Sequence, residues 1–424
     1  MKFLRIGICA LLVFGIAAHG AVEAWARAVL ETGAGLLFLV WAVRGYFYKQ
    51  EQLVISPLLP PLAALALLAL GQWMFHGTAS AYDTRIELQL LLAYGLLLFL
   101  ASQVFRTLED WRVFFWFVML FGFFVATFGI LQHLTFNGKL YWFREMRYGG
   151  IPFGPYVNRN HFAGFAELVI PVGLVPLVLG KVRRERWFLV GVFAVLPIVA
   201  LFLSASRGGI VSFGVQLAAL ALWMVVQRRI AGAQLLAAGA VLLVAVLLIS
   251  WLGVGQILQR FSTLQSLEAS QSKRASMRHD TWRIFLDHPW TGAGLGTLQT
   301  VFPRYETLYD GKIVNHTHND YLEALAETGI AGGLCCAWFL AALLIDPLRR
   351  LLQPGDSFAT ALRLAGLLAC AGFLVHSLVD FNLHIPANAF LFFLMAHLAT
   401  SDIQRTLPEA RASRRHRKHH RIPD

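Results

Sequence analysis

Long apolar runs alternate with short polar connections along almost the whole chain. Each run is close to the roughly 20 residues that an α-helix needs to cross the hydrocarbon core of a bilayer. The pattern predicts about twelve transmembrane helices, at residues 3–19, 26–45, 57–75, 87–105, 112–134, 161–180, 187–204, 208–227, 231–252, 321–345, 359–377 and 386–400. One connection is much longer than the others, because about residues 253–320 separate the ninth helix from the tenth. We therefore expect an all-α polytopic membrane protein with one large loop.

The composition supports this class. Hydrophobic residues make up 57% of the chain and charged residues 14%, whereas about 25% of the residues of a soluble protein are charged. We expect residues 1–404 to form a single transmembrane domain and residues 405–424 a basic tail. Cysteines fall only inside predicted helices, which indicates neither a disulfide framework nor a metal site; they are Cys9, Cys335, Cys336 and Cys370.

Lysine and arginine gather in alternate connections and at both ends of the chain. With twelve spans all of these positions lie on one side, which the positive-inside rule assigns to the cytoplasm. The basic positions are Lys2 and Arg5, Arg44 and Lys49, Arg106 and Arg112, Lys181 to Arg186, Arg228 and Arg229, Arg349 and Arg350, and the tail from Arg405 to Arg421. The net charge of +12 then indicates contact with anionic membrane lipids and not with nucleic acid. The basic start before a short apolar run also resembles a signal peptide, so removal of the first helix stays open.

The large loop has three parts. Residues 270–278 are polar and basic, residues 280–287 place large side chains at helical spacing, and residues 288–296 are rich in glycine. Its aromatic and aliphatic content is too high for a solvated linker. We expect two or three short helices in this loop, on the periplasmic side.

Four polar clusters fall on the same side as the large loop. They are Asn158-Arg159-Asn160-His161, Ser204-Ala205-Ser206-Arg207-Gly208-Gly209, Asn315-His316-Thr317-His318-Asn319-Asp320, and the segment from His376 to His384 that includes Asp380. Ionisable groups are costly near a bilayer and are functional candidates by default. Their concentration on one side predicts an active site at the periplasmic face of the membrane.

These residue types suggest a chemistry. Arg207 and Arg278 are permanent cations that can bind a phosphate with two hydrogen bonds, and Arg207 lies beside a helix N-terminus, which favours anions. His318 can accept a proton near neutral pH. A base together with a diphosphate clamp is what glycosyl transfer from a lipid diphosphate requires. We expect further substrate contacts from Asn158, Arg159, His161, Ser206, His316, Asn319 and Asp380.

Simpler interpretations stand beside these. His318 alone could cap the tenth helix, and Arg278 could pair with Asp280 or Asp287 in the loop. His316 and His318 could be metal ligands, but no third ligand follows at a fixed spacing, so we expect no metal site.

The remaining polar residues also have structural interpretations. The Asn-Arg-Asn-His cluster could be an ordinary helix cap, and Arg207 a positive residue at the level of the lipid headgroups. Glu323 and Glu327 lie one turn apart in the tenth helix, where we expect them to orient a histidine or an arginine. Asp380 needs a cationic partner if it is enclosed.

Three motifs in a fixed order resemble the O-antigen ligase/polymerase family over about residues 160–345. They are Ser206-Arg207-Gly208-Gly209; His288-Pro289 with Gly292, Gly294 and Gly296; and His318-Asn319 followed by nine residues and then Gly329-Ile330-Ala331-Gly332. The resemblance implies an inverting C-type membrane glycosyltransferase of the bacterial inner membrane, with both termini in the cytoplasm and with no metal or nucleotide cofactor. It implies undecaprenyl-diphosphate-linked glycan as donor and His318 as the base. It also implies that Arg207 and a loop arginine, for which we choose Arg278 over Arg274 and Arg283, bind the diphosphate.

Three kinds of enzyme share these motifs. An O-antigen ligase transfers polysaccharide to the lipid A–core, a polymerase to another lipid-linked repeat unit, and a protein O-oligosaccharyltransferase to Ser or Thr. The His-Asn-x9-Gly-x-x-Gly spacing favours the ligase. The third type often carries a large C-terminal soluble domain, which is not found here. A lipid-linked glycan transporter would place polar groups near the bilayer midplane beside broken helices, whereas the middle parts of the predicted helices are interrupted only by Pro171, Pro176 and Pro197.

Overall fold

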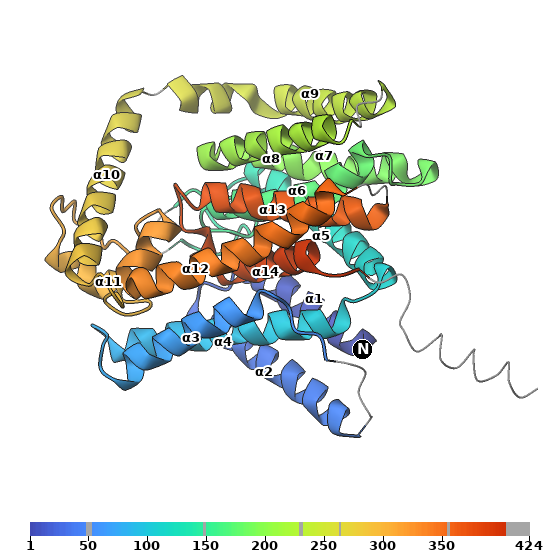
Figure 1. The fold of residues 1–424 in the computed structure, drawn as a ribbon. Helices are drawn as coiled ribbons and strands as arrows, with labels where there is room; N and C mark the ends of the chain where they lie inside the picture. Colours follow the sequence, from blue (N-terminus) through green and yellow to red (C-terminus); the bar gives the residue numbers. More distant parts are fainter. Residues whose placement is uncertain (48–52, 147–149, 229–231, 263, 354–356, 404–424) are drawn as a thin grey trace, which may run out of the picture.

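The computed structural model describes residues 1–47, 53–146, 150–228, 232–262, 264–353 and 357–403, and within these it is helical with no β-strand (Figure 1). Twelve long helices lie where the apolar pattern predicts them, which confirms the all-α class. They are α1 (Lys2–Ala17), α2 (Ala24–Phe47), α3 (Leu59–Met74), α4 (Ala81–Val104), α5 (Leu108–Leu134), α6 (Arg159–Val178), α7 (Trp187–Leu203), α8 (Arg207–Val226), α9 (Gly232–Ser262), α12 (Asp320–Leu352), α13 (Phe358–His376) and α14 (Pro386–Thr400).

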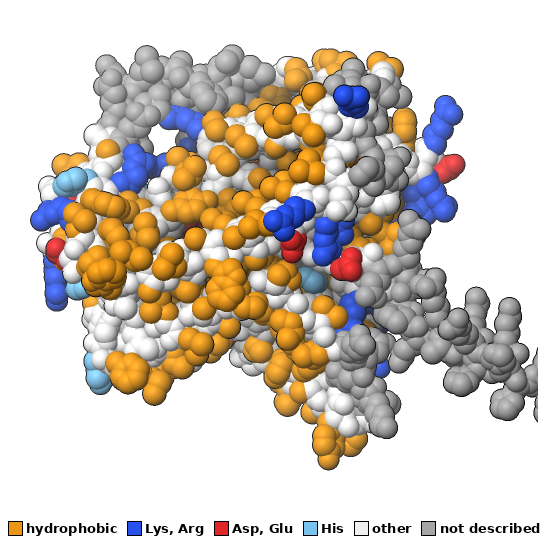
Figure 2. All heavy atoms as spheres, viewed as in Figure 1, with side chains coloured by type: hydrophobic (Ala, Val, Ile, Leu, Met, Phe, Trp, Pro, Cys, Tyr) orange, Lys and Arg blue, Asp and Glu red, His pale blue; other side chains and the backbone are white. Residues whose placement is uncertain are grey.

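Eight of the helices in the described part of the chain are long and apolar enough to cross a membrane, namely α2, α4, α5, α6, α7 with the preceding turn η1 (Arg184–Arg186), α8, α12 and α13. Shorter apolar helices are α3, α14 and the stretch Ala238–Leu252 of α9. Hydrophobic side chains cover the middle of the bundle, and Lys and Arg gather toward its two ends (Figure 2). The chain is thus a polytopic membrane protein, and the count of twelve spans stays a prediction.

The core of the bundle is formed by α6, α13 and α14. Every residue of α6 from His161 to Val178 is buried, and so is every residue of α14. Helix α13 packs against α6, α14 and α8. A helix that is apolar all round is expected in the interior of a large bundle, so α6 and α14 are enclosed by protein on all sides.

Side-chain caps fix where several helices begin. The Ser80 hydroxyl accepts a hydrogen bond from the Asp83 amide, so α4 starts six residues before the expected position. Asn158 caps α6, Ser206 caps α8 and Asn319 caps α12. A side-chain oxygen at this position satisfies an amide that would otherwise have no partner. Three of the four polar clusters therefore stand at helix starts.

The basic connections meet at the end of the bundle marked by the N-terminus in Figure 1. Arg5 at the start of α1 pairs with Asp110 at the start of α5. Arg350 near the end of α12 pairs with Asp402, just after α14. The expectation that these connections share one side agrees with these contacts. That this side is the cytoplasm stays a prediction.

The structure corrects the expected large loop. Helix α9 continues to Ser262 instead of ending near residue 252, and α10 (Leu264–Asp287) is one helix of 24 residues. No glycine or proline occurs between Gly255 and Pro289, and the polar residues there include good helix formers such as Lys, Arg, Gln and Ala. The polar stretch at 270–278 is therefore helical. Helix α10 runs steeply across the ends of α8 and α13 (Figure 1); only α11 (Leu298–Val301) and η2 (Phe302–Arg304) are short helices.

Helix α12 is also different from the expected clean span. It extends to Leu352 and is broken at Gly329, whose φ of +62° lies in the left-handed region. Around this break the backbone pairs with the glycine-rich stretch of the loop. The Ala293 amide donates to the Ala326 carbonyl at 2.9 Å, and the Ile330 amide donates to the Pro289 carbonyl at 2.8 Å.

Two glycines allow this backbone contact, which we call the glycine clasp (residues 289–294 against 326–331). A Cβ atom at Gly329 would lie 2.4 Å from the carbonyl carbon of Trp290. A Cβ atom at Gly292, where φ is +75°, would lie 2.1 Å from the carbonyl carbon of Glu327. The His-Pro and the Gly-x-x-Gly motifs are therefore two halves of one structural element, which anchors the loop to α12.

Substitution of Gly329 by alanine tests the clasp. A positive φ costs an L-residue about 1–2 kcal/mol, and the new Cβ atom also collides with backbone that cannot move aside. We expect Gly329→Ala to lower the thermal unfolding midpoint in detergent clearly. Gly214→Ala in α8, where a Cβ atom meets nothing within 4 Å, is the matched control, and equal midpoints for the two variants would contradict the clasp.

Candidate functional site

The four polar clusters meet at the end of the bundle opposite to the N-terminus. The Asp320 amide at the start of α12 donates to the Ser377 carbonyl at 2.9 Å. Asn160 at the start of α6 donates from Nδ2 to Oδ2 of Asp380 at 2.5 Å. At the start of α8, a Cβ atom on Gly208 would touch the His376 ring. Segments far apart in the sequence are therefore brought together as the one-sided pattern predicts.

His318 and Asp380 form the central pair of the site. His318 has a φ of +56°, and its Nδ1 lies 3.1 Å from Oδ1 of Asp380. The Asp380 side chain is 1% exposed and the His318 side chain 24%. The Phe381 amide also donates to Oδ1 at 2.9 Å. Asp380 therefore orients the imidazole through Nδ1 and leaves Nε2 as the nitrogen that can meet a substrate.

Asp380 is held in its ionised form. Burial raises the pKa of this carboxyl, but the hydrogen bond with His318 and the nearby His161 and His376 more than offset burial and hold the pKa well below its usual value. The sequence indicated that an enclosed Asp380 would need a cationic partner; the structure gives it a hydrogen bond with the imidazole of His318, the proposed base. An aspartate behind a histidine stabilises the imidazolium that forms when the ring takes a proton.

The Phe381 ring packs against three histidines. It stacks on His316 with ring centroids 4.4 Å apart, and it meets His161 and His318 edge-on, each at 4.9 Å. His161 is buried and therefore supports this ring instead of standing at the open surface. Sequence reasoning did not single out Phe381, because an aromatic residue in an apolar chain gives no signal of its own.

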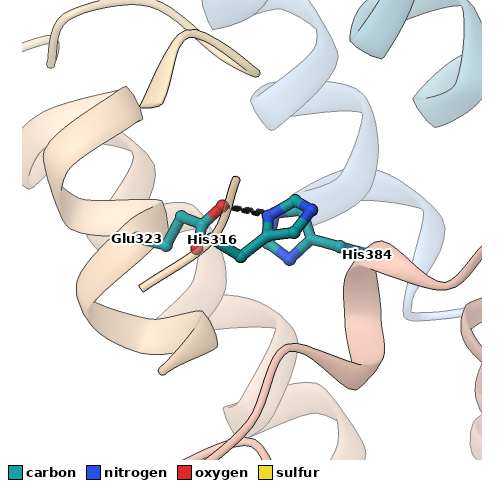
Figure 3. A group of neighbouring side chains, drawn as sticks. All are labelled: His316, Glu323 and His384. Atoms are coloured by element: carbon teal, nitrogen blue, oxygen red, sulfur yellow. Dashed lines mark hydrogen bonds and ion pairs between the residues drawn. The ribbon is translucent and has the colours of Figure 1, made fainter. Parts of the chain in front are cut away.

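A second histidine–carboxylate cluster lies beside the first (Figure 3). His316 Nδ1 is 2.7 Å from Oε1 of Glu323, and His384 Nε2 is 3.3 Å from the same oxygen. The other ring nitrogen of His384 lies 2.8 Å from Oδ1 of Asp320, and the Thr317 amide donates to Oε2 of Glu323. The candidate ligand atoms of His316, Glu323 and His384 lie within 4.8 Å of one another.

This cluster changes two expectations. His316 and His318 do not face a common point, because His318 bonds Asp380 while His316 faces Glu323. Glu323 orients a histidine, as expected. Glu327 does not; it accepts hydrogen bonds from the amides of Gly296 and Leu298 and so fastens the end of the glycine-rich stretch.

His384 carries positive charge in this cluster. Burial lowers its pKa, but the carboxylates of Glu323 and Asp320 raise it, and the net result is a pKa well above the usual value for histidine. The sequence indicated only that His384 and Asp380 belong to the same polar segment. Its pairing with Asp320 depends on the turn η3 (Asn382–His384), which no local pattern reveals.

The two predicted arginines lie on different elements. Arg207 is the first residue of α8 and is exposed, whereas the Ser206 hydroxyl is buried and caps the same helix by accepting from Gly209. Arg278 is half-buried on α10. One turn earlier, Arg274 donates to the Val379 carbonyl at 3.2 Å. Helix α10 therefore contacts the turn that carries Asp380.

Arg278 does not take either carboxylate that the sequence offered as a structural partner. Asp280 accepts hydrogen bonds from Thr307, and Asp287 from the Tyr305 hydroxyl. Within the described residues Arg278 forms no ion pair with an acidic side chain.

Other candidates have mainly structural contacts. Asn158 caps α6 by accepting from the Asn160 amide at 2.9 Å, which matches the cap interpretation. Arg159 is the first residue of α6 and half-buried. Asn319 caps α12 and also donates from Nδ2 to the Leu378 carbonyl. Asn160, which was not chosen, is the residue of its cluster that touches Asp380.

A buried ionisable pair that the sequence did not indicate joins α6 to α13. Glu167 of α6 and His376 at the end of α13 are fully enclosed, with Oε1 and Nδ1 2.8 Å apart. Their positions are more than two hundred residues apart in sequence, so their pairing has no local signature. The pair lies directly behind the start of α8, because a Cβ atom on Gly209 would come within 3.2 Å of Glu167 Oε1.

The low pKa of Asp380 predicts how its contribution to stability depends on pH. A carboxyl with a depressed pKa stabilises the folded state above its unfolded value of about 3.9, and this stabilisation is lost only as the pH falls toward the folded value. We expect Asp380→Asn to lower the thermal midpoint, with a gap to wild type at pH 5 at least as large as at pH 7. A gap that closes between pH 7 and pH 5 would show that Asp380 is protonated there and would contradict this assignment.

Comparison with known proteins gives one match. A family model described as O-antigen ligase matches residues 168–337. The matched part contains the Ser-Arg-Gly-Gly turn, α10, both halves of the glycine clasp and the His318 motif, while Asp380 and His384 lie beyond it. No curated protein matches the chain.

Proposed function

We propose that this chain is an O-antigen ligase, and the match over residues 168–337 supports its membership of the O-antigen ligase/polymerase superfamily. It transfers O-antigen polysaccharide from undecaprenyl diphosphate to the lipid A–core oligosaccharide at the periplasmic face of the inner membrane. The observation that carries the proposal is the His318–Asp380 pair, with its partly exposed imidazole inside the matched motif and its aspartate fully enclosed.

The chemical step follows from this geometry. A hydroxyl oxygen of the acceptor sugar attacks the anomeric carbon of the donor, and Nε2 of His318 takes the hydroxyl proton. The bond from that carbon to the diphosphate oxygen breaks with inversion, and the diphosphate leaves with the electron pair. Asp380 stabilises the imidazolium that results, through the bond to Nδ1.

The arginines stabilise the leaving group. Arg207 at a helix N-terminus and Arg278 on α10 approach the site from two elements, and both can fork onto phosphate oxygens. Charge that develops on the diphosphate during bond cleavage is then met by fixed cations. The proposed step therefore requires neither a metal ion nor a nucleotide.

The donor enters from the membrane in this proposal. Its lipid tail stays in the bilayer beside the bundle, and its diphosphate lies at the level of the helix ends that carry the site. Helix α10 crosses these ends (Figure 1) and contacts the Asp380 turn through Arg274. In this proposal the arginines of α10 lie close to the diphosphate of the donor.

Replacement of His318 tests the base and, in two hosts, the acceptor. Wild type should restore the full lipopolysaccharide ladder in a ligase-deleted Gram-negative host of the same O-antigen type. His318→Ala should show only bare lipid A–core and accumulated lipid-linked glycan, because loss of a general base costs roughly 10²–10⁴-fold in rate.

The control is His76→Ala, which removes an exposed histidine after α3. It should behave as wild type at equal protein level. Normal ligation by His318→Ala would contradict the assignment of His318 as the general base. Wild type could instead fail in this host and restore chain length in a polymerase-deleted host. The glycosyl-transfer reaction would then stand, and the acceptor would be a lipid-linked repeat unit.

Charge and shape can be separated at Arg207. Arg207→Ala should abolish transfer, and Arg207→Lys should recover only a part of it, because lysine offers a point charge in place of a planar fork. The effect should appear as weaker use of the lipid-linked donor in a membrane transfer assay. Arg349→Ala, at the opposite end of the bundle, is the matched loss of an exposed arginine and should leave transfer intact; full activity of Arg207→Ala would contradict its role.

A further inference from the structure

The cluster of His316, Glu323 and His384 has no role in the proposed chemistry, although three chain segments converge on it. His316 comes from the loop before α12, Glu323 from the first turn of α12, and His384 from η3 after α13. We propose that these three side chains bind a divalent transition-metal ion of the zinc type, and that the ion ties the three segments together. The ion would hold these segments in place without taking part in glycosyl transfer, so the site goes beyond the proposed function.

The donor set is the first argument. Two imidazole nitrogens and one carboxylate oxygen are a set that binds Zn²⁺ and leaves a fourth position open. The three candidate atoms lie within 4.8 Å of one another, and Figure 3 shows the Glu323 carboxylate bonded to His316 with the His384 ring next to the His316 ring.

The distances are the second argument. Zinc bonds of about 2.0–2.1 Å place two tetrahedral ligands about 3.3 Å apart. His384 Nε2 and Glu323 Oε1 are 3.3 Å apart. His316 Nδ1 is closer to that oxygen, at 2.7 Å, so a small rotation of the His316 side chain admits the ion.

The surrounding hydrogen bonds are the third argument. In the neutral form of His384, Nδ1–H donates to Asp320 and Nε2 presents its lone pair toward Oε1 of Glu323, so two acceptors face each other unless a proton or a metal ion lies between them. A positive ion between them resolves this conflict. A carboxylate that fixes the second nitrogen of a histidine ligand is the usual support of a metal site, and the Thr317 amide fixes Glu323 through its other oxygen in the same way.

The cluster lies close in sequence to both residues of the His318–Asp380 pair. His316 lies two residues before His318, and His384 lies four residues after Asp380. An ion held by His316 and His384 would fix both chain segments that carry the His318–Asp380 pair. It therefore positions His318 against Asp380 without touching a reacting atom.

The alternative is a proton in place of the ion. A doubly protonated His384 would satisfy Asp320 and Glu323 with no metal, and the same three residues would then be a hydrogen-bonded cluster only. Metal content separates the two, because it is measured without any reference to transferase activity.

The experiment is a metal count on the full chain. The basic tail contains His416, His419 and His420, so the parent protein carries asparagine at these three positions and is purified in detergent without a polyhistidine tag. It is loaded with Zn²⁺, freed of excess by gel filtration, and analysed by inductively coupled plasma mass spectrometry. We expect about one zinc ion per chain in the parent protein.

Variants locate the ion. His384→Ala and His316→Gln should each lose most of the bound zinc, and Asp320→Asn should weaken zinc binding by roughly 10–100-fold as a lost supporting contact. His279→Ala removes a histidine that is 67% exposed on α10 and should keep the full count. Zinc should also raise the thermal midpoint of the parent protein but not that of His384→Ala.

Two results would overturn the site. One is a monodisperse parent protein that holds no zinc after loading. The other is an equal zinc count in the parent, His316→Gln and His384→Ala. Either result leaves the ligase proposal standing, since that proposal rests on His318 and on the arginines.

Discussion

The arrangement of this site depends on the need of buried carboxylates for partners. A carboxylate withdrawn from water is costly unless a cation or several hydrogen bonds compensate it. Here four enclosed acidic side chains at the site end of the bundle meet an imidazole from another segment: Asp380 meets His318, Asp320 and Glu323 meet His384, and Glu167 meets His376. These pairs join α6 and the start of α12 to the end of α13 and the turn after it.

A second constraint acts on the backbone. The loop between α9 and α12 could place its arginines anywhere if it were tethered only at its ends. The glycine clasp fixes its far end, since Gly292 and Gly329 let two backbones approach at the break in α12. The near end is a rigid helix, α10, whose Arg274 reaches the Asp380 turn. Motifs that are separate in the sequence are therefore parts of one frame around the histidine pair.

Much of the fold could be predicted from the sequence because its strongest signal is local. Apolar runs located twelve of the long helices, and the alternation of basic connections predicted which helix ends lie together; the polar helix α10 was not among them. The prediction failed where local chemistry was ambiguous. The polar stretch at 270–278 was not recognised as helix, and the break at Gly329 follows from a contact with Trp290 that only the folded chain provides.

The candidate site could be predicted less completely. The four polar clusters indicated which segments meet at the site, and Asp380 was expected to need a cation. The pairing of side chains across segments, however, has no signature in a single sequence. Asn160, Phe381 and the His384 cluster were missed for this reason. The resemblance to O-antigen ligases identified His318, and the structure added the aspartate behind it.

The central claim is that Asp380 holds His318 as the base for glycosyl transfer. The most direct test measures initial rates with purified protein, lipid-linked O-antigen donor and lipid A–core acceptor, for wild type and Asp380→Asn. The account predicts that kcat falls by at least about 10²-fold, as for a base held in the wrong tautomer, while the KM for the donor changes little. An unchanged kcat in a correctly folded Asp380→Asn protein would contradict it.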